Sequence, residues 1–228
     1  MSLLNKVAHR IAGKRRFEAK RRQRRLVTNT DFTIFSNDCW GAEVYKYLDR
    51  PFNTPFIGLF LMGPCFIEFL RDPKFYVAQE LVFQDVSHYE AINQIRAKTP
   101  YPLATLGGKV EISFLHYHSP EEAREKWTRR VARINWNNLL VKFDGSKDGA
   151  TPELVREFEQ MPYRRLLLVK EPVPGAATAV VVPQYTTNGA HMFLSSLPDY
   201  DFVNWVNTGN PKFTLANWVM HKLLGSGG

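Results

Sequence analysis

The sequence predicts an α/β fold, a three-layer sandwich with a mostly parallel sheet, preceded by a basic N-terminal helix or tail. Segments with the pattern of buried strands alternate with segments that carry helix-capping residues, which is typical of a parallel sheet covered by helices. The 228 residues are 44% apolar and 13% aromatic, which is enough to bury a full core in one large domain. Positive charge is concentrated in the first 25 residues.

The basic arm is expected over residues 1–28, followed by a single α/β domain over residues 29–224 and a linker remnant at residues 225–228. Residues 1–25 contain ten Lys or Arg and one Glu, so the arm carries +9 and the rest of the chain −1. Apolar residues lie mainly at helical spacing on one side: Leu3, Leu4, Val7, Ile11 and Phe17. This pattern favours an anionic membrane surface as the partner of residues 1–25, with a solvated tail as the alternative and nucleic acid the least favoured.

A cytoplasmic protein is expected, held by its arm at the inner face of the membrane. The N-terminus lacks the apolar stretch of a signal peptide, and two cysteines do not suggest a disulfide scaffold. Residues 54–70 are strongly apolar but are interrupted by Gly63-Pro64 and contain Glu68. This segment is too short for a membrane span and is predicted to be core, including Cys65.

The predicted elements follow in order from residue 31. Residues 31–36 (DFTIFS) form a buried strand, residues 37–41 a turn, and residues 42–48 a short helix that ends before Pro51. Residues 109–117 alternate apolar and polar side chains as a half-buried strand does, after the turn Gly107-Gly108. Ser119, Pro120 and Glu122 then form a capping box for a helix that runs to about residue 134.

The remaining elements continue the alternation. Residues 139–143 (LLVKF) form another strand, Thr151-Pro152 begins a second capped helix, and residues 165–170 and 178–182 form later strands. The final segment, with Trp205 and Trp218, is less regular.

Cys39 is the predicted nucleophile, because it lies in the loop between the first strand and its helix, where open α/β sheets bind ligands. A helix N-terminus lowers the pKa of a thiol. The Asn37 side chain and the backbone amides of Trp40 and Gly41 are predicted to hold a developing oxyanion, and Ser36 and Glu43 to contact substrate. The alternative is an inert, buried cysteine.

His116 is the predicted general base, because it ends a predicted strand that reaches the same sheet edge as Cys39 if the two strands are parallel neighbours. His118 lies two residues further on, and His191 is the second candidate. Asp38 or Glu43 are expected to orient the imidazole. In the following helix, Arg130 and Arg133 are predicted to bind a phosphate or carboxylate, with a solvated helix face as the alternative.

Other site types are missing from the sequence. It contains no P-loop, no Gly-x-Gly-x-x-Gly and no paired-cysteine zinc pattern, and no metal site is predicted. His116-x-His118 lacks a further ligand nearby. The only Asp-x-Asp, Asp199-Tyr-Asp201, follows Pro198 and is predicted to be a turn.

Six segments resemble a bacterial family of unknown function whose members are often labelled exopolysaccharide or capsular polysaccharide biosynthesis proteins. They are residues 36–45 (SNDCWGAEVY), 55–60 (PFIGLF), 114–117 (FLHY), 126–130 (KWTRR), 133–135 (RIN) and 200–205 (YDFVNW). This family is similar to capsule proteins with an SGNH-hydrolase-like sheet, which are thought to move acyl groups onto sugars through a cysteine or serine after the first strand. Cys39 matches that position.

The resemblance implies an SGNH/flavodoxin-like sheet and an acyl (acetyl) transferase that modifies a surface polysaccharide or its precursor. Acetyl-CoA is then the expected donor, with no tightly bound cofactor. The sequence departs from the SGNH pattern because it has no clear Asp-x-x-His near its end, which leaves the identity of the base open. The alternatives are a glycosyl- or phospho-transferase of polysaccharide assembly and a non-catalytic scaffold at the membrane surface.

Overall fold

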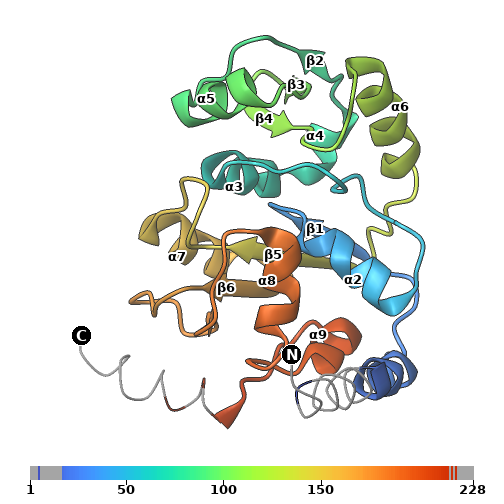
Figure 1. Ribbon diagram of the computed structural model, residues 1–228, viewed down its shortest axis with the longest axis vertical. Coiled ribbons are helices and arrows are strands. Elements are labelled where there is room, and N and C mark those ends of the chain that lie inside the picture. The colour runs from blue at the N-terminus through green and yellow to red at the C-terminus, as the bar shows by residue number, and fades with distance from the viewer. Residues whose placement is uncertain (1–4, 6–16, 216, 218, 220–228) are drawn as a thin grey trace.

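The computed structural model describes residues 5, 17–215, 217 and 219, and over this part the chain forms a mixed α/β fold with two sheets (Figure 1). The strands are β1 (Thr33–Ser36), β2 (Val82–Phe83), β3 (Leu103–Leu106), β4 (Val110–Ser113), β5 (Leu139–Asp144), β6 (Arg164–Val169) and β7 (Val180–Val181). The helices are α2 (Trp40–Leu48), α3 (Gly63–Arg71), α4 (Pro73–Ala78), α5 (Glu90–Lys98), α6 (Pro120–Val131), α7 (Pro152–Gln160), α8 (Gly189–Ser196) and α9 (Phe202–Thr208). A further helix over residues 17–26 precedes β1.

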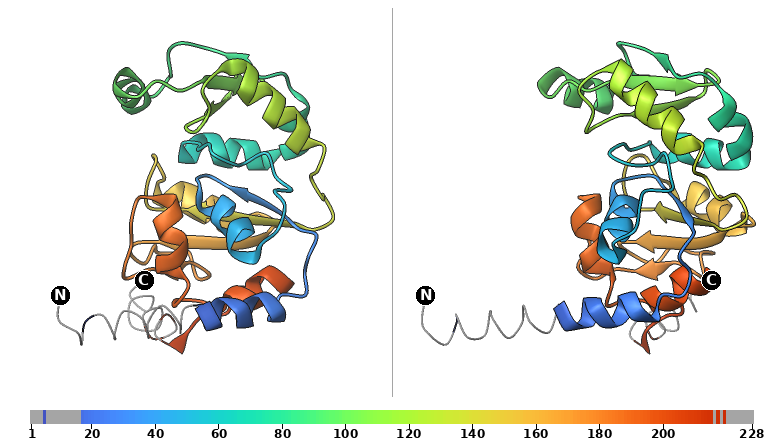
Figure 2. Two further views of the ribbon diagram at one scale, coloured as in Figure 1. Left: turned by 45° about the vertical axis from the view of Figure 1, so that its right-hand side comes forward. Right: turned by 90° about the vertical axis from the view of Figure 1, so that its right-hand side faces the viewer.

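The larger sheet has the strand order β1-β5-β6-β7, and every neighbouring pair in it is parallel. Alternate side chains of its strands enter two separate apolar clusters, which explains why these strands read as near-continuous apolar runs. Helices α2, α8 and α9 pack on one face, and α3 and α7 on the other (Figure 2). The predicted mostly parallel sheet with helices is confirmed.

The smaller sheet, with the order β2-β3-β4, is antiparallel and corrects one prediction. The predicted strand at residues 109–117 is present as β4, but it pairs with β3 and does not join the parallel sheet. The cause lies in the turn between them, where Gly107 and Gly108 have positive φ angles of 57° and 70°. A tight glycine turn returns the chain beside the preceding strand and therefore makes the pair antiparallel.

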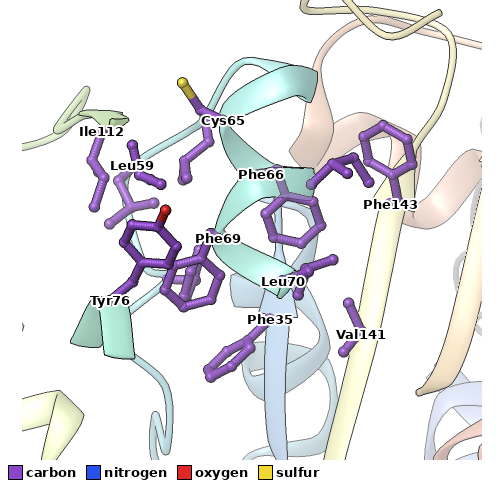
Figure 3. Packing of buried hydrophobic residues seen from close by; sticks show 14 of the residues in the cluster. Phe35, Leu59, Cys65, Phe66, Phe69, Leu70, Tyr76, Ile112, Val141 and Phe143 are labelled. Carbon is purple, nitrogen blue, oxygen red and sulfur yellow. The ribbon is translucent and has the colours of Figure 1, made fainter. Parts of the chain in front are cut away.

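One apolar cluster joins the two sheets through α3 (Figure 3). Phe35 of β1 packs against Phe56 and Phe69, with ring centroids 4.9 and 5.4 Å apart, and the same cluster contains Ile112 of β4. Cys65 is buried in it, as predicted for residues 54–70. No helix of the described residues is both long and apolar enough to cross a membrane.

The helix over residues 17–26 packs against α2 and leads into contacts with α9 (Figure 1). Arg24 Nε donates a hydrogen bond to the Tyr47 carbonyl (2.6 Å), and the Tyr47 hydroxyl donates to Gln23. Val27 is buried in the core. The end of the predicted arm is therefore part of the folded domain. Leu3, Leu4, Val7, Ile11 and the predicted linker at residues 225–228 lie outside the described residues.

Candidate active site at the carboxyl edge of the parallel sheet

The carboxyl ends of β1 and β5 lie side by side and bring polar side chains together. Ser36 pairs with Lys142 in the parallel register. As the chain leaves β1, Asn37 Oδ1 accepts a hydrogen bond from the Asp144 amide (2.9 Å), which ties the two strand ends together. Asp38 Oδ1 then accepts from the Trp40 amide and from Ser36 Oγ, both at 3.0 Å, and so caps the first turn of α2.

Asp38 is the centre of a buried ion cluster that also contains Lys142, Asp144, Lys147 and Asp148. Lys142 Nζ lies 2.9 and 3.0 Å from the two Asp38 oxygens, and Lys147 Nζ lies 2.9 Å from Asp38 Oδ2. Burial raises the pKa of Asp38, but the two lysines outweigh burial and hold this pKa far below its ordinary value. Asp38 is therefore a fixed carboxylate at any physiological pH.

Asp144 occupies the other side of the cluster and differs from Asp38. Its Oδ1 accepts hydrogen bonds from the Tyr185 hydroxyl (2.8 Å) and the Ser146 amide (3.1 Å). Its Oδ2 is buried and has no hydrogen-bond partner among the described residues, with Lys142 Nζ 3.9 Å away. Burial raises the pKa of Asp144, and the charge of Asp38 adds to this effect. A carboxyl group with a raised pKa and a free oxygen is a candidate for proton transfer.

Cys39 is the residue before α2, and its half-buried thiol is not activated in the way the sequence predicts. Burial raises the pKa of the thiol to about 11, and the charge of Asp38 raises it further against the opposing charges of Lys147 and Lys46. The predicted lowering by the helix N-terminus is wrong because the Asp38 carboxylate takes the Trp40 amide and repels a second negative charge beside it. The free protein therefore holds Cys39 as a thiol.

The segment before α8 covers the cluster. Lys147 Nζ donates to the Thr187 carbonyl (2.8 Å), and Tyr185 bonds Asp144. At the first residue of α8, a Cβ atom on Gly189 would lie 2.9 Å from Asp38 Cγ and 3.1 Å from the Cys39 amide nitrogen. Only glycine allows α8 to begin this close to α2. The N-termini of these two helices consequently meet beside Cys39, where their dipoles favour negative charge.

The residues around Cys39 that were predicted to hold an oxyanion or contact substrate are buried or bonded to neighbouring residues of the protein. The Asn37 and Ser36 side chains are buried and bonded as described above, and the Trp40 amide is taken by Asp38. The Trp40 ring is fully buried against Phe193 and Trp205, with centroids 5.5 Å away in both cases. The Trp40 ring and amide and the Asn37 amide group are therefore unavailable to a ligand in this structure.

Two further predicted residues, Gly41 and Glu43, also have structural partners. A Cβ atom on Gly41 would lie 3.1 Å from Ser36 Cβ, so this glycine lets α2 pack closely on β1 and does not face a ligand. Glu43 forms an ion pair with Lys46 (2.7 Å), one turn along the helix, and so does not orient an imidazole.

The predicted base and the arginines lie in the second lobe of the structure, which consists of the antiparallel sheet β2-β3-β4 and α6. They follow β4 in the chain. His116 is exposed, its amide donates to the Gly58 carbonyl (2.9 Å), and its ring has no hydrogen bond to a described residue. Since β4 is not in the parallel sheet, His116 does not reach the Cys39 edge in the way the sequence suggests. Arg130 donates to the Tyr117 hydroxyl (2.5 Å), while Arg133 is exposed and forms no ion pair with a described residue.

Tyr117 links that lobe electrostatically to Cys39. Its hydroxyl donates to the Ile57 carbonyl (2.6 Å). Burial raises the pKa of Tyr117, Arg130 lowers it, and a negative charge on Cys39 raises it. The Arg130–Tyr117 pair is therefore within electrostatic range of the thiol. The other candidate histidines, His118 and His191, are exposed and use their backbone amides to bond helix-capping side chains.

The described residues include no group of three or more His, Cys, Asp or Glu side chains with the arrangement of a metal site. The Asp-x-Asp triplet has structural roles. Asp199 lies in a turn, as predicted, and Asp201 caps α9 by accepting from the Asn204 amide (2.9 Å).

Four charged residues of the cluster are missing from the sequence-based prediction: Lys142, Asp144, Lys147 and Asp148. The available signal was a lysine and an aspartate in the strand LLVKFD, since charged side chains in an otherwise apolar, buried strand require partners. Lys147 follows in the loop, where the sequence pattern contains no comparable signal.

A family model described as a domain of unknown function matches residues 11–208. The chain belongs to the DUF1919 family. It is also similar to an uncharacterized protein of Haemophilus influenzae, with 28% identity over 221 residues, covering 91% of this chain and 99% of that protein. The DUF1919 match covers the ion cluster, Cys39 and the helix over residues 17–26.

Proposed function

We propose that this protein is an acetyltransferase that modifies a surface polysaccharide or its precursor, with Cys39 as the acyl-accepting residue and acetyl-CoA as the donor. The observation that carries the proposal is the half-buried thiol beside the Asp38–Lys147 ion pair, at the carboxyl edge of a parallel sheet. Ligands of open α/β sheets bind outside this edge. The polysaccharide setting rests on the sequence resemblance, as does an SGNH-like form of the sheet, which the helices on both faces support.

In the proposed reaction, Cys39 Sγ attacks the thioester carbonyl of acetyl-CoA and the bond from that carbonyl to the CoA sulfur breaks. The proton of Cys39 passes to the departing CoA thiolate. A sugar hydroxyl then attacks the acetyl carbonyl, the bond from that carbonyl to Cys39 Sγ breaks, and the proton of the hydroxyl returns to the Cys39 thiolate. Lys46, whose side chain is exposed and whose charge acts on the Cys39 thiol, is the proposed contact for the phosphates of the donor, since Lys147 is bonded to Asp38 and the Thr187 carbonyl.

Alkylation of Cys39 tests this proposal. In a Cys65→Ser background, where Cys39 is the remaining thiol, reaction with iodoacetamide should follow a pKa near 11. At pH 7 the thiolate fraction is then roughly 300-fold smaller than that of a free thiol with a pKa of about 8.5. Acetyl-CoA should protect the thiol and add one acetyl group to it, as seen by mass spectrometry, and Cys39→Ala should abolish the adduct.

The control is the Cys39→Ala protein with Cys65 retained, which should gain no acetyl group. A Cys39 that ignores acetyl-CoA at every pH contradicts the acetyltransferase and leaves the scaffold as the better description.

We also propose an anionic membrane surface as a partner, which serves either the enzyme or the scaffold. On the helix over residues 17–26, Phe17 and Leu26 are 61% and 50% exposed. Arg21, Arg22 and Arg25 form no ion pair with a described residue, whereas Arg24 is bonded to α2. The helix is thus attached by one side and leaves basic and apolar side chains on the other, a combination that favours anionic lipid.

Vesicle flotation checks the membrane proposal. The protein should float with vesicles containing phosphatidylserine and not with pure phosphatidylcholine. Replacing Arg21, Arg22 and Arg25 by Gln should weaken binding by about 100-fold, since each basic residue contributes about 1 kcal/mol near an anionic surface. Lys98, Arg133 and Lys170, replaced together by Gln, remove the same charge elsewhere and should change little. Equal loss in both variants would indicate net charge alone.

A further inference from the structure

A cavity lies at the opposite edge of the parallel sheet from Cys39. It has a volume of about 280 Å³ and is lined by Tyr163, Arg165, Thr178, Gly209, Asn210, Pro211, Lys212 and Phe213. Arg165 is near the amino end of β6, and Thr178 precedes β7. Because the strands are parallel, this cavity is separated from Cys39 by the length of the sheet.

The cavity wall contains two cationic side chains without acidic partners among the described residues, Arg165 and Lys212. Arg165 Nη1 donates to the Met161 carbonyl (3.2 Å), but its Nε is buried and has no hydrogen-bond partner among the described residues. A buried donor that is left unpaired is costly unless a ligand or water satisfies it. The preceding residue shows the contrast: Arg164 donates to Asn138, Asn207 and Thr208 and is fully used by the fold.

The backbone at Lys212 is a second, independent feature. Its φ angle is 39°, in the left-handed region that residues other than glycine rarely adopt. Strain of this kind persists where the surrounding structure imposes it, and it is concentrated at binding sites. The segment is held by the Asp201 amide, which donates to the Pro211 and Lys212 carbonyls at 2.8 and 3.0 Å. The fold therefore keeps Lys212 at the cavity wall.

We infer that this cavity binds a small phosphate monoester, of the class of sugar phosphates and nucleotides. The guanidinium of Arg165 and the ammonium of Lys212 match a dianionic phosphate group. The rings of Tyr163 and Phe213 offer apolar walls for a sugar or base, and Asn210 and Thr178 offer polar contacts. Glu159 accepts a hydrogen bond from the Thr178 amide (2.5 Å), so one carboxylate lies next to the cavity wall. Arg165 and Lys212 together still give the wall a net positive charge. The volume suits a ligand at the small end of the usual range, about 300 Å³.

Isothermal titration calorimetry of the full chain tests this inference. Inorganic phosphate, a hexose 1-phosphate and uridine 5′-monophosphate serve as separate probes. The esters should bind more tightly than inorganic phosphate, and preference between them identifies a sugar or a nucleotide as the source of the phosphate. Lys212→Ala and Arg165→Gln should each weaken the preferred ester by about tenfold or more, the effect of losing one charge-assisted hydrogen bond.

Lys170→Gln is the matched control, since it removes a positive charge from an exposed position just after β6 and should leave binding unchanged. Cys39→Ala should also bind normally, which separates this site from the proposed acetyltransferase. If Arg165→Gln fails to fold, the exposed Lys212→Ala decides the question alone. Absence of ester binding, or binding that both cavity variants leave intact, overturns the inference.

Discussion

Replacement of Lys142 by methionine is expected to lower the free energy of unfolding by about 3–5 kcal/mol, the usual cost of removing one partner from a buried ion pair. Lys142 is fully buried and lies within hydrogen-bond distance of both Asp38 oxygens. Without it, Asp38 keeps Lys147 as its close counter-charge, while Asp144 loses the cation 3.9 Å from its Oδ2 and is repelled by Asp38. Urea unfolding followed by tryptophan fluorescence measures the change.

Two further variants test whether this cost arises from the buried carboxylates that lose Lys142 as a counter-charge. Lys170→Met removes an exposed lysine, whose side chain is 63% exposed, and should cost less than about 1 kcal/mol. Asp38→Asn combined with Lys142→Met should recover part of the lost stability, because it removes one of the two buried carboxylates that share Lys147 once Lys142 is gone. A loss of less than about 1 kcal/mol in the single Lys142 variant would mean that the cluster is open to water.

The second large effect is expected at Trp40, whose truncation to alanine should cost about 3–5 kcal/mol of stability. The ring is fully buried, lies against Phe193 and Trp205, and has Lys142 Nζ 5.8 Å from its centroid. Thermal or urea unfolding measures the loss. A residue that only contacted substrate would instead leave stability unchanged and alter ligand binding, which separates the two roles.

Phe75→Ala is the control for loss of a large aromatic side chain. Phe75 is 49% exposed, so its truncation should cost less than about 1 kcal/mol. Equal destabilisation by the two substitutions would contradict the assignment of Trp40 to the core.

The sequence was sufficient to predict the parallel sheet because its strands and helices have strong local signals. The predicted strands at LLVKF and before Asn37 are present as β5 and β1. The predicted capping residues Ser119 and Thr151 begin α6 and α7. The alternation of apolar and polar residues predicted a half-buried strand, whereas β4 is buried along its whole length, with Glu111 and Ser113 in the interior. Its antiparallel pairing was not predicted because the alternation does not say which strand lies beside it. The short β2 and β3 have no comparable periodicity.

At the candidate site, the position of Cys39 could be predicted from the sequence but its pKa could not. The position of Cys39 between β1 and α2 follows from its neighbours in the chain. The pKa of Cys39 cannot be derived from those neighbours. The thiol is buried beside α8, and the Asp38 carboxylate is held charged by Lys142 of β5, and both elements are distant in sequence. The dipole of α2 alone predicts a lowered pKa for Cys39, whereas burial and Asp38 raise it.

The bond between Asn37 and Asp144 joins residues 107 positions apart, and this separation has a consequence for how the protein folds. The strands β5 and β6, with α7 between them, are close in sequence, whereas β1 pairs with β5 across all the residues between positions 36 and 139. Long chain closures of this kind slow folding. We therefore expect β1 to dock late, so that Asp38 meets Lys142 at the end of folding. In chains that have not yet docked β1, the two lysines and two aspartates that complete the cluster remain in contact with water. Their charges are then solvated, and the intermediate contains no buried charge that lacks a partner.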